Sequence, residues 1–180
     1  MTYDKTESLK LGKITEDHFK SIFINCIDAT EHENIYEHWD VRIDNIKIDI
    51  KGMKRELRND SSVNGYRHYI ELRGVRGHPG WLYGKADYFA FETIEDFLLV
   101  EKIKLQKWVD KNIIKEEVTK PELYKLYSRV GRLDQMTLVK TSDLFLISDI
   151  FVSKEDKDID LAKLVLTKID LTEFVKFSDS

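Results

Sequence analysis

Two aspartates and a lysine lie close together in the stretch EHWDVRIDNIKIDIKGMKR, which runs from Glu37 to Arg55. Asp40 precedes Asp49, and a single residue separates Asp49 from Lys51. Carboxylate oxygens are hard ligands that suit Mg²⁺ or Mn²⁺. A lysine beside such a metal can orient or deprotonate a water, or stabilise negative charge as it develops. The chemistry available to these residue types is metal-assisted hydrolysis of a phosphodiester.

That chemistry needs the two carboxylates to meet, and a hairpin would bring them together. A two-residue turn at Asp44 and Asn45 pairs Asp40 with Asp49 by counting outward along both strands. Paired Cβ atoms lie roughly 4.5–5.5 Å apart, where like charges are destabilising. A bound cation would offset that repulsion. Strand alternation gives one apolar, core-facing side, made of Trp39, Val41, Ile43, Ile46, Ile48 and Ile50, and one polar side, made of His38, Asp40, Arg42, Lys47, Asp49 and Lys51.

A plain amphipathic hairpin with a solvated charged side explains the same pattern. In that case Arg42 and Lys47 would neutralise the aspartates diagonally across the strands. The pairing also depends on the turn, because a slip of one residue would separate the two carboxylates.

The composition favours one globular domain that folds around its own core. The chain has 180 residues, of which 42% are hydrophobic, and we expect a core over about 12–150 and a C-terminal extension over about 151–180. The first residues lack the apolar core of a signal peptide, and no apolar run approaches the roughly 18 residues of a membrane span. A single cysteine, Cys26, is predicted to be a buried thiol. We therefore expect a soluble, cytoplasmic protein with no membrane partner.

Charge is distributed unevenly along the chain. The net charge is −4, yet residues 42–85 contain ten Lys or Arg against five Asp or Glu, which is +5 locally. A basic middle in an acidic chain suggests an anionic partner at one site. An ordinary charged surface accounts for it equally well.

Periodicity predicts a fold of class α/β (α+β), with a central mixed sheet flanked by helices. A helix is expected over 15–28, with Thr15 as its N-cap, and Pro121 is expected to begin a short helix over 120–128. The nearly continuous apolar run over 85–92 predicts a central strand buried on both faces. Further strands are expected over 66–73, 97–100 and 136–140 and a helix over 101–114, while 143–147 fits either type and 158–177 stays undetermined.

At the hairpin the chain resembles the PD-(D/E)xK nuclease superfamily. The stretch WDVRI supplies Asp40 and IDIK supplies Asp49 and Lys51, while Trp39 stands where the family has proline. The stretches GWLYGKADYFAFE and PELYKLYSRVGRLDQ look like segments of small phage-encoded proteins of this group. The resemblance covers residues 12–92 best.

The resemblance implies a restriction-endonuclease-like fold and an Mg²⁺-dependent DNA endonuclease, in which Mn²⁺ can substitute. Asp40, Asp49 and the main-chain carbonyl of Ile50 would be metal ligands, and Lys51 the catalytic lysine. The family often adds a glutamate from the first helix, for which Glu16 is the best match. Asp17 competes for that role, and Glu71 in a later strand could also face the site.

Contacts with DNA are expected from basic residues after the lysine. Lys54 and Arg55 would follow the phosphates, and so would Arg73, Arg76 and Lys85 in the glycine-rich stretch 73–85. Trp81 and Tyr83 could stack on unpaired bases or anchor this loop in the core.

The preferred substrate is branched DNA, as for a Holliday-junction resolvase. A restriction-type or nicking enzyme is a close alternative, and two others are a nuclease-fold module that binds without cleaving and a metal-free accessory protein. Cutting two strands requires two active sites, so a homodimer is expected on symmetry grounds.

Overall fold

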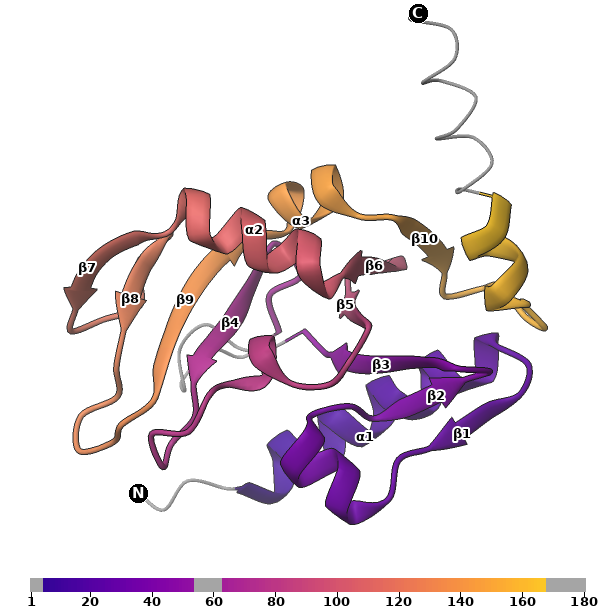
Figure 1. Ribbon diagram of the computed structural model, residues 1–180, viewed down its shortest axis with the longest axis horizontal. Coiled ribbons are helices and arrows are strands. Elements are labelled where there is room, and N and C mark those ends of the chain that lie inside the picture. Colours follow the sequence, from indigo (N-terminus) through magenta and orange to yellow (C-terminus); the bar gives the residue numbers. More distant parts are fainter. Residues whose placement is uncertain (1–4, 54–62, 168–180) are drawn as a thin grey trace, which may run out of the picture.

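The computed structural model describes residues 5–53 and 63–167, which form two β-sheets with helices packed on them (Figure 1). The larger sheet has the strand order β1 (Cys26–Asp28), β2 (Val41–Ile43), β3 (Ile46–Lys51), β5 (Tyr88–Glu92), β6 (Asp96–Glu101) and β10 (Ile150–Ser153). The smaller sheet has the order β4 (Arg67–Arg73), β9 (Gln135–Lys140), β8 (Lys125–Tyr127) and β7 (Ile114–Val118). The helices are α1 (Lys5–Ile22), α2 (Lys102–Asn112) and α3 (Thr141–Ile147), with short turns η1 (Glu33–Glu37) and η2 (Trp81–Tyr83).

The larger sheet is mixed, as predicted. Strand β3 pairs in parallel with β5, and the other neighbours in this sheet pair antiparallel. The predicted central strand over 85–92 is confirmed as β5, which lies between β3 and β6 and is buried on both faces. A second sheet was not expected from the sequence.

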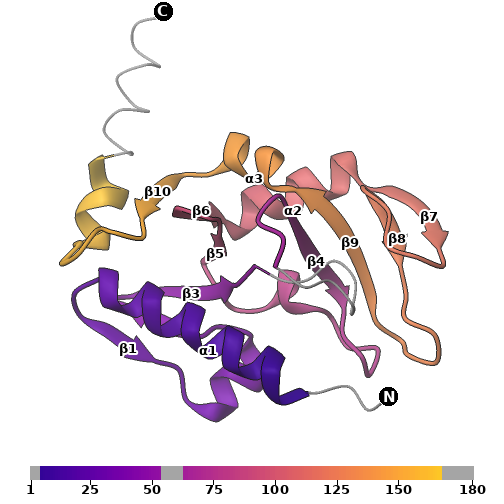
Figure 2. The ribbon, with the colours of Figure 1, turned by 180° about the vertical axis from the view of Figure 1, so that it is seen from behind.

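Two hydrophobic cores lie on opposite faces of the larger sheet. Helix α1 covers one face, where it lies along β3 (Figure 2), and its Phe19 and Ile22 pack against Val41, Ile43 and Ile48. The other face packs against α2, α3 and the smaller sheet, through a core that includes Ile70, Phe89, Phe91, Leu105, Val139 and Leu144. The hairpin of β2 and β3 is therefore enclosed between α1 and the second core.

The predicted hairpin register is confirmed for the three pairs nearest the turn, whereas the Asp40 N–H bonds to the Ile48 carbonyl and the predicted pairs beyond Val41 are not formed as strand pairs. Ile43 pairs with Ile46, Arg42 with Lys47 and Val41 with Ile48. The turn residue Asp44 has a φ of 53°, a left-handed conformation that aspartate and asparagine tolerate better than most residues.

Trp39 was predicted on the same apolar side as Val41, and this was wrong. The tryptophan packs into the second core, whereas Val41 lies in the core under α1. The reason is that His38 has a φ of 57° and β2 begins only at Val41. The chain turns before the strand, so strand alternation does not extend back to Trp39.

The predicted start of the first helix was also wrong. Helix α1 begins at Lys5 and ends at Ile22, so Thr15 lies inside the helix and not at its N-cap. The Thr15 hydroxyl bonds to Glu92 Oε2 at 2.8 Å and to the Leu11 carbonyl at 3.2 Å. The tertiary contact with Glu92 uses the hydroxyl that was assigned to capping.

The short helix predicted over 120–128 is wrong, because Lys125–Tyr127 forms strand β8. Tyr124 has a φ of 63°, and its main chain bonds on both sides, to the Leu138 carbonyl at 2.8 Å and from the Ile114 N–H at 2.7 Å. Pairing with two strands outweighs the local helix signal of Pro121. The undecided segment over 143–147 lies within helix α3.

The last described residues pack onto the core beneath α1. Strand β10 pairs antiparallel with β6, and residues 161–167 are helical. Ile150, Val152 and Leu161 are buried in that core. The remainder of the undetermined segment 158–177, from residue 168 on, lies outside the described residues.

Cys26 is half-buried beside the core under α1. Burial raises the pKa of its thiol to about 11, and the charge of Asp28 adds to the rise. The thiol is therefore protonated at neutral pH and is a poor nucleophile. In the described part of the chain, no helix combines the length and the hydropathy that a membrane span requires.

Candidate active site at the end of strand β3

Asp40 lies immediately before β2, where the chain enters the hairpin. Its N–H donates to the Ile48 carbonyl at 2.9 Å, and its carbonyl accepts from the Ala29 N–H at 2.8 Å. In a strand, the main-chain N–H and C=O groups of every second residue point toward the same neighbouring strand. The Ile50 N–H therefore points to the β2 side of β3, as the Ile48 carbonyl does. No β2 main chain lies opposite Ile50, because the chain turns at His38.

The Asp40 carboxylate occupies that position. Its Oδ2 accepts from the Ile50 N–H at 2.6 Å, and its Oδ1 accepts from Asn34 Nδ2 at 2.6 Å. The carboxylate is thus fixed at the edge of β3 by two hydrogen bonds. The Ile50 carbonyl is directed to the same side of β3, which places a main-chain oxygen near the carboxylate.

Asp49 is buried on the next position of β3. Its side chain is 4% exposed, and its Oδ1 pairs with Lys51 Nζ at 2.6 Å. Its Oδ2 is buried, and in the ionised form no described group donates a hydrogen bond to it. Burial raises the pKa of the Asp49 carboxyl to about 8; Lys51 opposes the rise, whereas the charge of Asp40 and a side-chain hydrogen bond between the two carboxyls add to it. A carboxylate in this environment is stabilised by any additional cation.

Lys51 is held between Asp49 and an indole ring. Its Nζ lies 4.4 Å from the centroid of the Trp81 ring, which is a favourable cation–π distance. Trp81 begins η2 and packs on Phe89, with ring centroids 4.8 Å apart. The preceding Gly80 passes so close to β4 that a Cβ there would lie 2.3 Å from the Glu71 carbonyl oxygen. Only glycine allows this approach, which positions Trp81 over Lys51.

The structure places Glu16 close enough to Asp40 for the two charges to interact. Glu16 lies on α1, and burial raises its pKa, with the charge of Asp40 as the next cause. Asp17, the competing residue, has a side chain that is 56% exposed and pairs with Lys13 at 3.0 Å and Lys20 at 3.1 Å. The geometry therefore favours Glu16 over Asp17 as the helix residue of this site.

Glu71 and His38 border the site on the β4 side. Burial lowers the pKa of His38, and the charge of Lys51 adds to this; Glu71 and Asp40 raise it. His38 is therefore surrounded by the charges of the site and is held toward its neutral form. Glu71 acts on this histidine from β4.

Three oxygen donors at the end of β3 suit a hard divalent cation: the carboxylates of Asp40 and Asp49 and the Ile50 carbonyl. The buried Asp49 Oδ2 without a partner is the observation that favours a cation there. Within residues 5–53 and 63–167, no three His, Cys, Asp or Glu side chains are grouped so as to hold a metal ion. Two carboxylates remain compatible with Mg²⁺, which keeps several waters and binds through one or two carboxylates.

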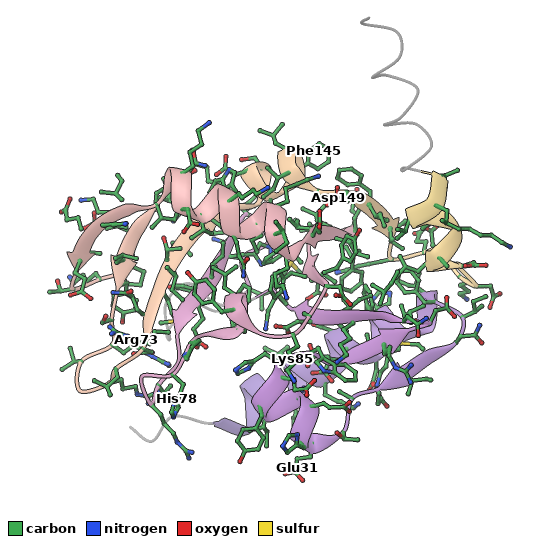
Figure 3. All side chains as sticks on the ribbon, in the orientation of Figure 1. Glu31, Arg73, His78, Lys85, Phe145 and Asp149 are labelled. Atoms are coloured by element: carbon green, nitrogen blue, oxygen red, sulfur yellow. The ribbon has the colours of Figure 1, made fainter. Side chains whose placement is uncertain are left out.

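The predicted DNA-contacting residues differ in their surroundings. Lys54 and Arg55 lie outside the described residues. Arg73 and Arg76 are exposed on β4 and the loop after it. Lys85 is exposed, but its Nζ pairs with Glu37 Oε1 at 2.8 Å (Figure 3 labels Arg73 and Lys85). Its charge is therefore partly neutralised, in contrast to those of the two arginines.

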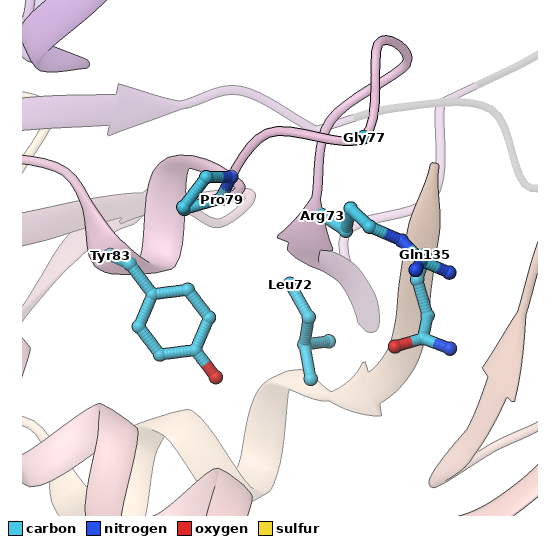
Figure 4. A pocket seen from close by; sticks show the side chains of 6 residues that line it. All are labelled: Leu72, Arg73, Gly77, Pro79, Tyr83 and Gln135. Carbon is cyan, nitrogen blue, oxygen red and sulfur yellow. The ribbon is translucent and has the colours of Figure 1, made fainter. Parts of the chain in front are cut away.

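A shallow pocket of about 440 Å³ lies between the end of β4, the loop after it, η2 and the start of β9 (Figure 4). It is lined by Leu72, Arg73, Gly77, Pro79, Tyr83 and Gln135. None of the site carboxylates lines it. Tyr83 is 47% exposed here, so it does not anchor the loop in the core as Trp81 does.

Glu92 is a buried acid that the sequence analysis missed. Its Oε2 accepts from Thr15 Oγ1 at 2.8 Å and from the Met53 N–H at 3.0 Å, and its Oε1 pairs with Lys154 at 2.9 Å. It joins α1, next to Glu16, to the chain just after Lys51. Glu92 ends the apolar run YFAFE, and an acidic residue in such a run predicts a buried carboxylate that is paired with a cation. Asn34 was also missed, and no local pattern marks it.

We expect Glu92→Gln to destabilise the fold by about 1–3 kcal/mol, because the half-buried Lys154 loses its counter-charge. Urea unfolding at neutral pH measures the change. Glu95→Gln is the matched control, since Glu95 is exposed in the turn that follows and should change stability by less than about 0.5 kcal/mol. Equal free energies of unfolding for Glu92→Gln and Glu95→Gln would contradict a stabilising role for the Glu92 contacts.

The end of β3 thus brings together Asp40, Asp49 and Lys51 of the hairpin, and Glu16 of helix α1 interacts with Asp40. Two carboxylates, a main-chain oxygen and a lysine can bind a cation and stabilise negative charge next to it. The sequence matches no family model, and searches of curated proteins and of solved structures returned no match.

Proposed function

We propose that this protein is a metal-dependent DNA endonuclease with a restriction-endonuclease-like active site, which hydrolyses phosphodiester bonds. The observation that supports this most directly is the pair Asp40 and Asp49. Both carboxylates lie at the end of β3, and no described group donates a hydrogen bond to the buried Asp49 Oδ2 in its ionised form. Burying an unpaired carboxylate oxygen is unfavourable, and a cation would remove that penalty.

Asp40, Asp49 and the Ile50 carbonyl would hold Mg²⁺, and Mn²⁺ could replace it. When bound, the metal supplies Lewis-acid activation and lowers the pKa of a water. Asn34 and the Ile50 N–H keep the Asp40 carboxylate oriented, at 2.6 Å each. This orientation is available before any ligand binds, so little reorganisation is needed.

Lys51 would stabilise the negative charge that develops on the phosphate. Its ammonium lies between Asp49 Oδ1, at 2.6 Å, and the Trp81 ring, at 4.4 Å. These two contacts limit its motion, which favours a fixed donor over a solvated one. Glu16 has a raised pKa, which suits a group that accepts a proton from the attacking water.

The proposed partner is DNA, and the proposed preference is for branched over linear duplex. Arg73 and Arg76 would contact the phosphate backbone, which positions a protein on DNA without reading base sequence. Such contacts favour recognition of backbone shape. Cutting both strands would involve a homodimer with one site on each strand.

The test is cleavage of a supercoiled plasmid and of a synthetic four-way junction, with Mg²⁺, Mn²⁺ or EDTA. We expect metal-dependent cleavage that Asp40→Asn lowers by about 100-fold or more. Asp44→Asn is the matched control, because it makes the same chemical change in the same hairpin at an exposed turn position with φ 53°. It should retain activity within about threefold.

Two outcomes would overturn the proposal. One is equal cleavage by the wild type and Asp40→Asn, which would locate the activity elsewhere. The other is no cleavage of either substrate together with no Mg²⁺ binding by calorimetry.

A further inference from the structure

Two exposed turns lie side by side at the end of the molecule that carries the loops after β4 and β8 (Figures 1 and 2). The first turn is closed by a bond from the Gly77 N–H to the Gly74 carbonyl at 2.9 Å. The second is closed by a bond from the Arg132 N–H to the Arg129 carbonyl at 3.0 Å. We call residues 74–77 and 129–133 together the twin turns.

The twin turns contact each other directly. The Leu133 N–H donates to the Val75 carbonyl at 3.4 Å. A Cβ placed on Gly77 would lie 3.3 Å from Leu133 Cδ1, so the leucine side chain packs against that glycine. The two turns, which are far apart in the sequence, therefore form one projection.

The projection exposes apolar side chains. Val130 is 98% exposed, Leu133 is 60% exposed and Val75 is 45% exposed. Turns usually carry glycine, proline, asparagine, aspartate or serine at such positions. A single exposed apolar side chain needs no explanation, but three on adjoining turns indicate an interaction surface.

The second turn is held in shape from below. Asp134 is fully buried, accepts from the Arg129 N–H at 3.3 Å and forms an ion pair with the Arg129 guanidinium. Gly131 has a φ of 74°, which glycine adopts readily and other residues do not. The turn therefore holds Val130 in a defined position. Arg129 is paired with Asp134, so we assign it to stabilising the turn and not to binding a partner.

The charge around the projection is positive. Arg73, Arg76 and Arg132 are exposed, and no ion pair within the described residues joins any of them to a carboxylate. Arginines without a counter-charge beside apolar tips complement a phosphate backbone that borders stacked bases.

The projection lies close to the candidate site along the chain. Five residues lead from Arg76 to Trp81, so their Cα atoms are at most about 18 Å apart, and Trp81 lies over Lys51. The first of the twin turns is therefore within reach of DNA that has a phosphate at Lys51.

Resting on the proposed function, we propose that the twin turns are a wedge for DNA. Val130 enters between base pairs, and Arg76 and Arg132 bind the phosphates on either side. Separating stacked base pairs costs a few kcal/mol per step, and that cost is lower where the bases are already unpaired. The wedge therefore selects branched or kinked DNA over linear duplex.

The experiment measures DNA binding by fluorescence anisotropy in EDTA, so that no cleavage is involved. The probes are a linear duplex and a four-way junction with 2-aminopurine at its centre. We expect Val130→Ser to weaken junction binding by about 10-fold, to leave duplex binding within about twofold, and to remove the 2-aminopurine fluorescence increase. Leu146→Ser is the matched control, because Leu146 is 81% exposed on α3.

The double variant Arg76→Ala with Arg132→Ala tests the phosphate contacts. It should weaken binding to both probes and lower the salt slope of log K by about 2. Unchanged junction binding and fluorescence in Val130→Ser would overturn the wedge, and unchanged DNA binding in the double variant would indicate a protein partner instead. Val130-dependent junction binding without cleavage by the wild type would support the wedge and count against the nuclease, so the two proposals fail separately.

Discussion

Asp49→Asn is expected to abolish metal-dependent cleavage and, at the same time, to stabilise the metal-free protein near pH 8. The asparagine removes a carboxylate that the fold buries beside Asp40. Its amide can accept from Lys51 with the oxygen and donate toward Asp40 with the nitrogen. We expect cleavage to fall by about 1,000-fold or more, because one of the two carboxylate ligands is lost.

The effect on stability follows from the pKa of Asp49. Its ordinary value is 3.8, and burial raises it to about 8 in the folded protein. Between these values the folded state keeps a proton that the unfolded state has released. Stability therefore falls as pH rises through this window, by an amount on the order of a few kcal/mol. The asparagine side chain does not titrate in this pH window, so the unfolding free energy of Asp49→Asn lacks this part of the pH dependence.

Urea unfolding in EDTA at about pH 5 and about pH 8 measures this difference. The difference in free energy of unfolding between Asp49→Asn and the wild type should be small at the lower pH. At the higher pH the variant should be the more stable of the two. Added Mg²⁺ should stabilise the wild type increasingly with pH, because the ligand must lose its proton, and should not stabilise the variant. Asp44→Asn should follow the wild type throughout. Parallel pH slopes for Asp49→Asn and the wild type would contradict the buried, proton-bound carboxyl.

Lys51→Ala is expected to lower cleavage by about 100- to 1,000-fold while Mg²⁺ binding is kept or tightened. The lysine ammonium pairs with Asp49 Oδ1 at 2.6 Å, so it competes with a metal for the same carboxylate. Removing it takes away one positive charge next to the metal position. The loss of activity would then reflect missing stabilisation of the phosphate and not a missing metal.

Calorimetry with Mg²⁺ and single-turnover cleavage, measured on the same preparations, separate these two effects. Lys47→Ala is the matched control, because Lys47 lies on the same strand but pairs with Glu37 at 3.2 Å and lies 4.9 Å from the Trp39 ring centroid. It should retain cleavage within a few-fold. Parallel losses of Mg²⁺ binding and cleavage in Lys51→Ala would assign the lysine a structural role instead.

Most of the strands near the site could be predicted from the sequence, because their signals are local. Period-two alternation and the Asp44 turn determine the register of β2 and β3, and the apolar run over 85–92 determines the central strand. These patterns involve residues close together in the chain, and burial of one face enforces them. That register predicted Asp40 opposite Asp49; the Asp40 main chain bonds to Ile48 instead, and the two carboxyls still act on each other.

Only the tertiary structure decided which residues surround the two aspartates. Glu16 and Asp17 are adjacent in sequence, and the packing of α1 on the sheet half-buries the first and exposes the second. Trp81 reaches Lys51 because Gly80 passes against β4. Asn34 reaches Asp40 across the turn at His38.

Strand β8 shows that contacts between distant segments can also decide secondary structure. Pro121 favours a helix start, yet the main chain at Tyr124 pairs with Ile114 and Leu138. The sequence by itself determined the hairpin and its paired carboxylates, because alternation and turn chemistry act between near neighbours. The second sheet, the burial of Asp49 Oδ2 and the position of the lysine depend on contacts between distant segments, and such contacts form only when the whole chain packs.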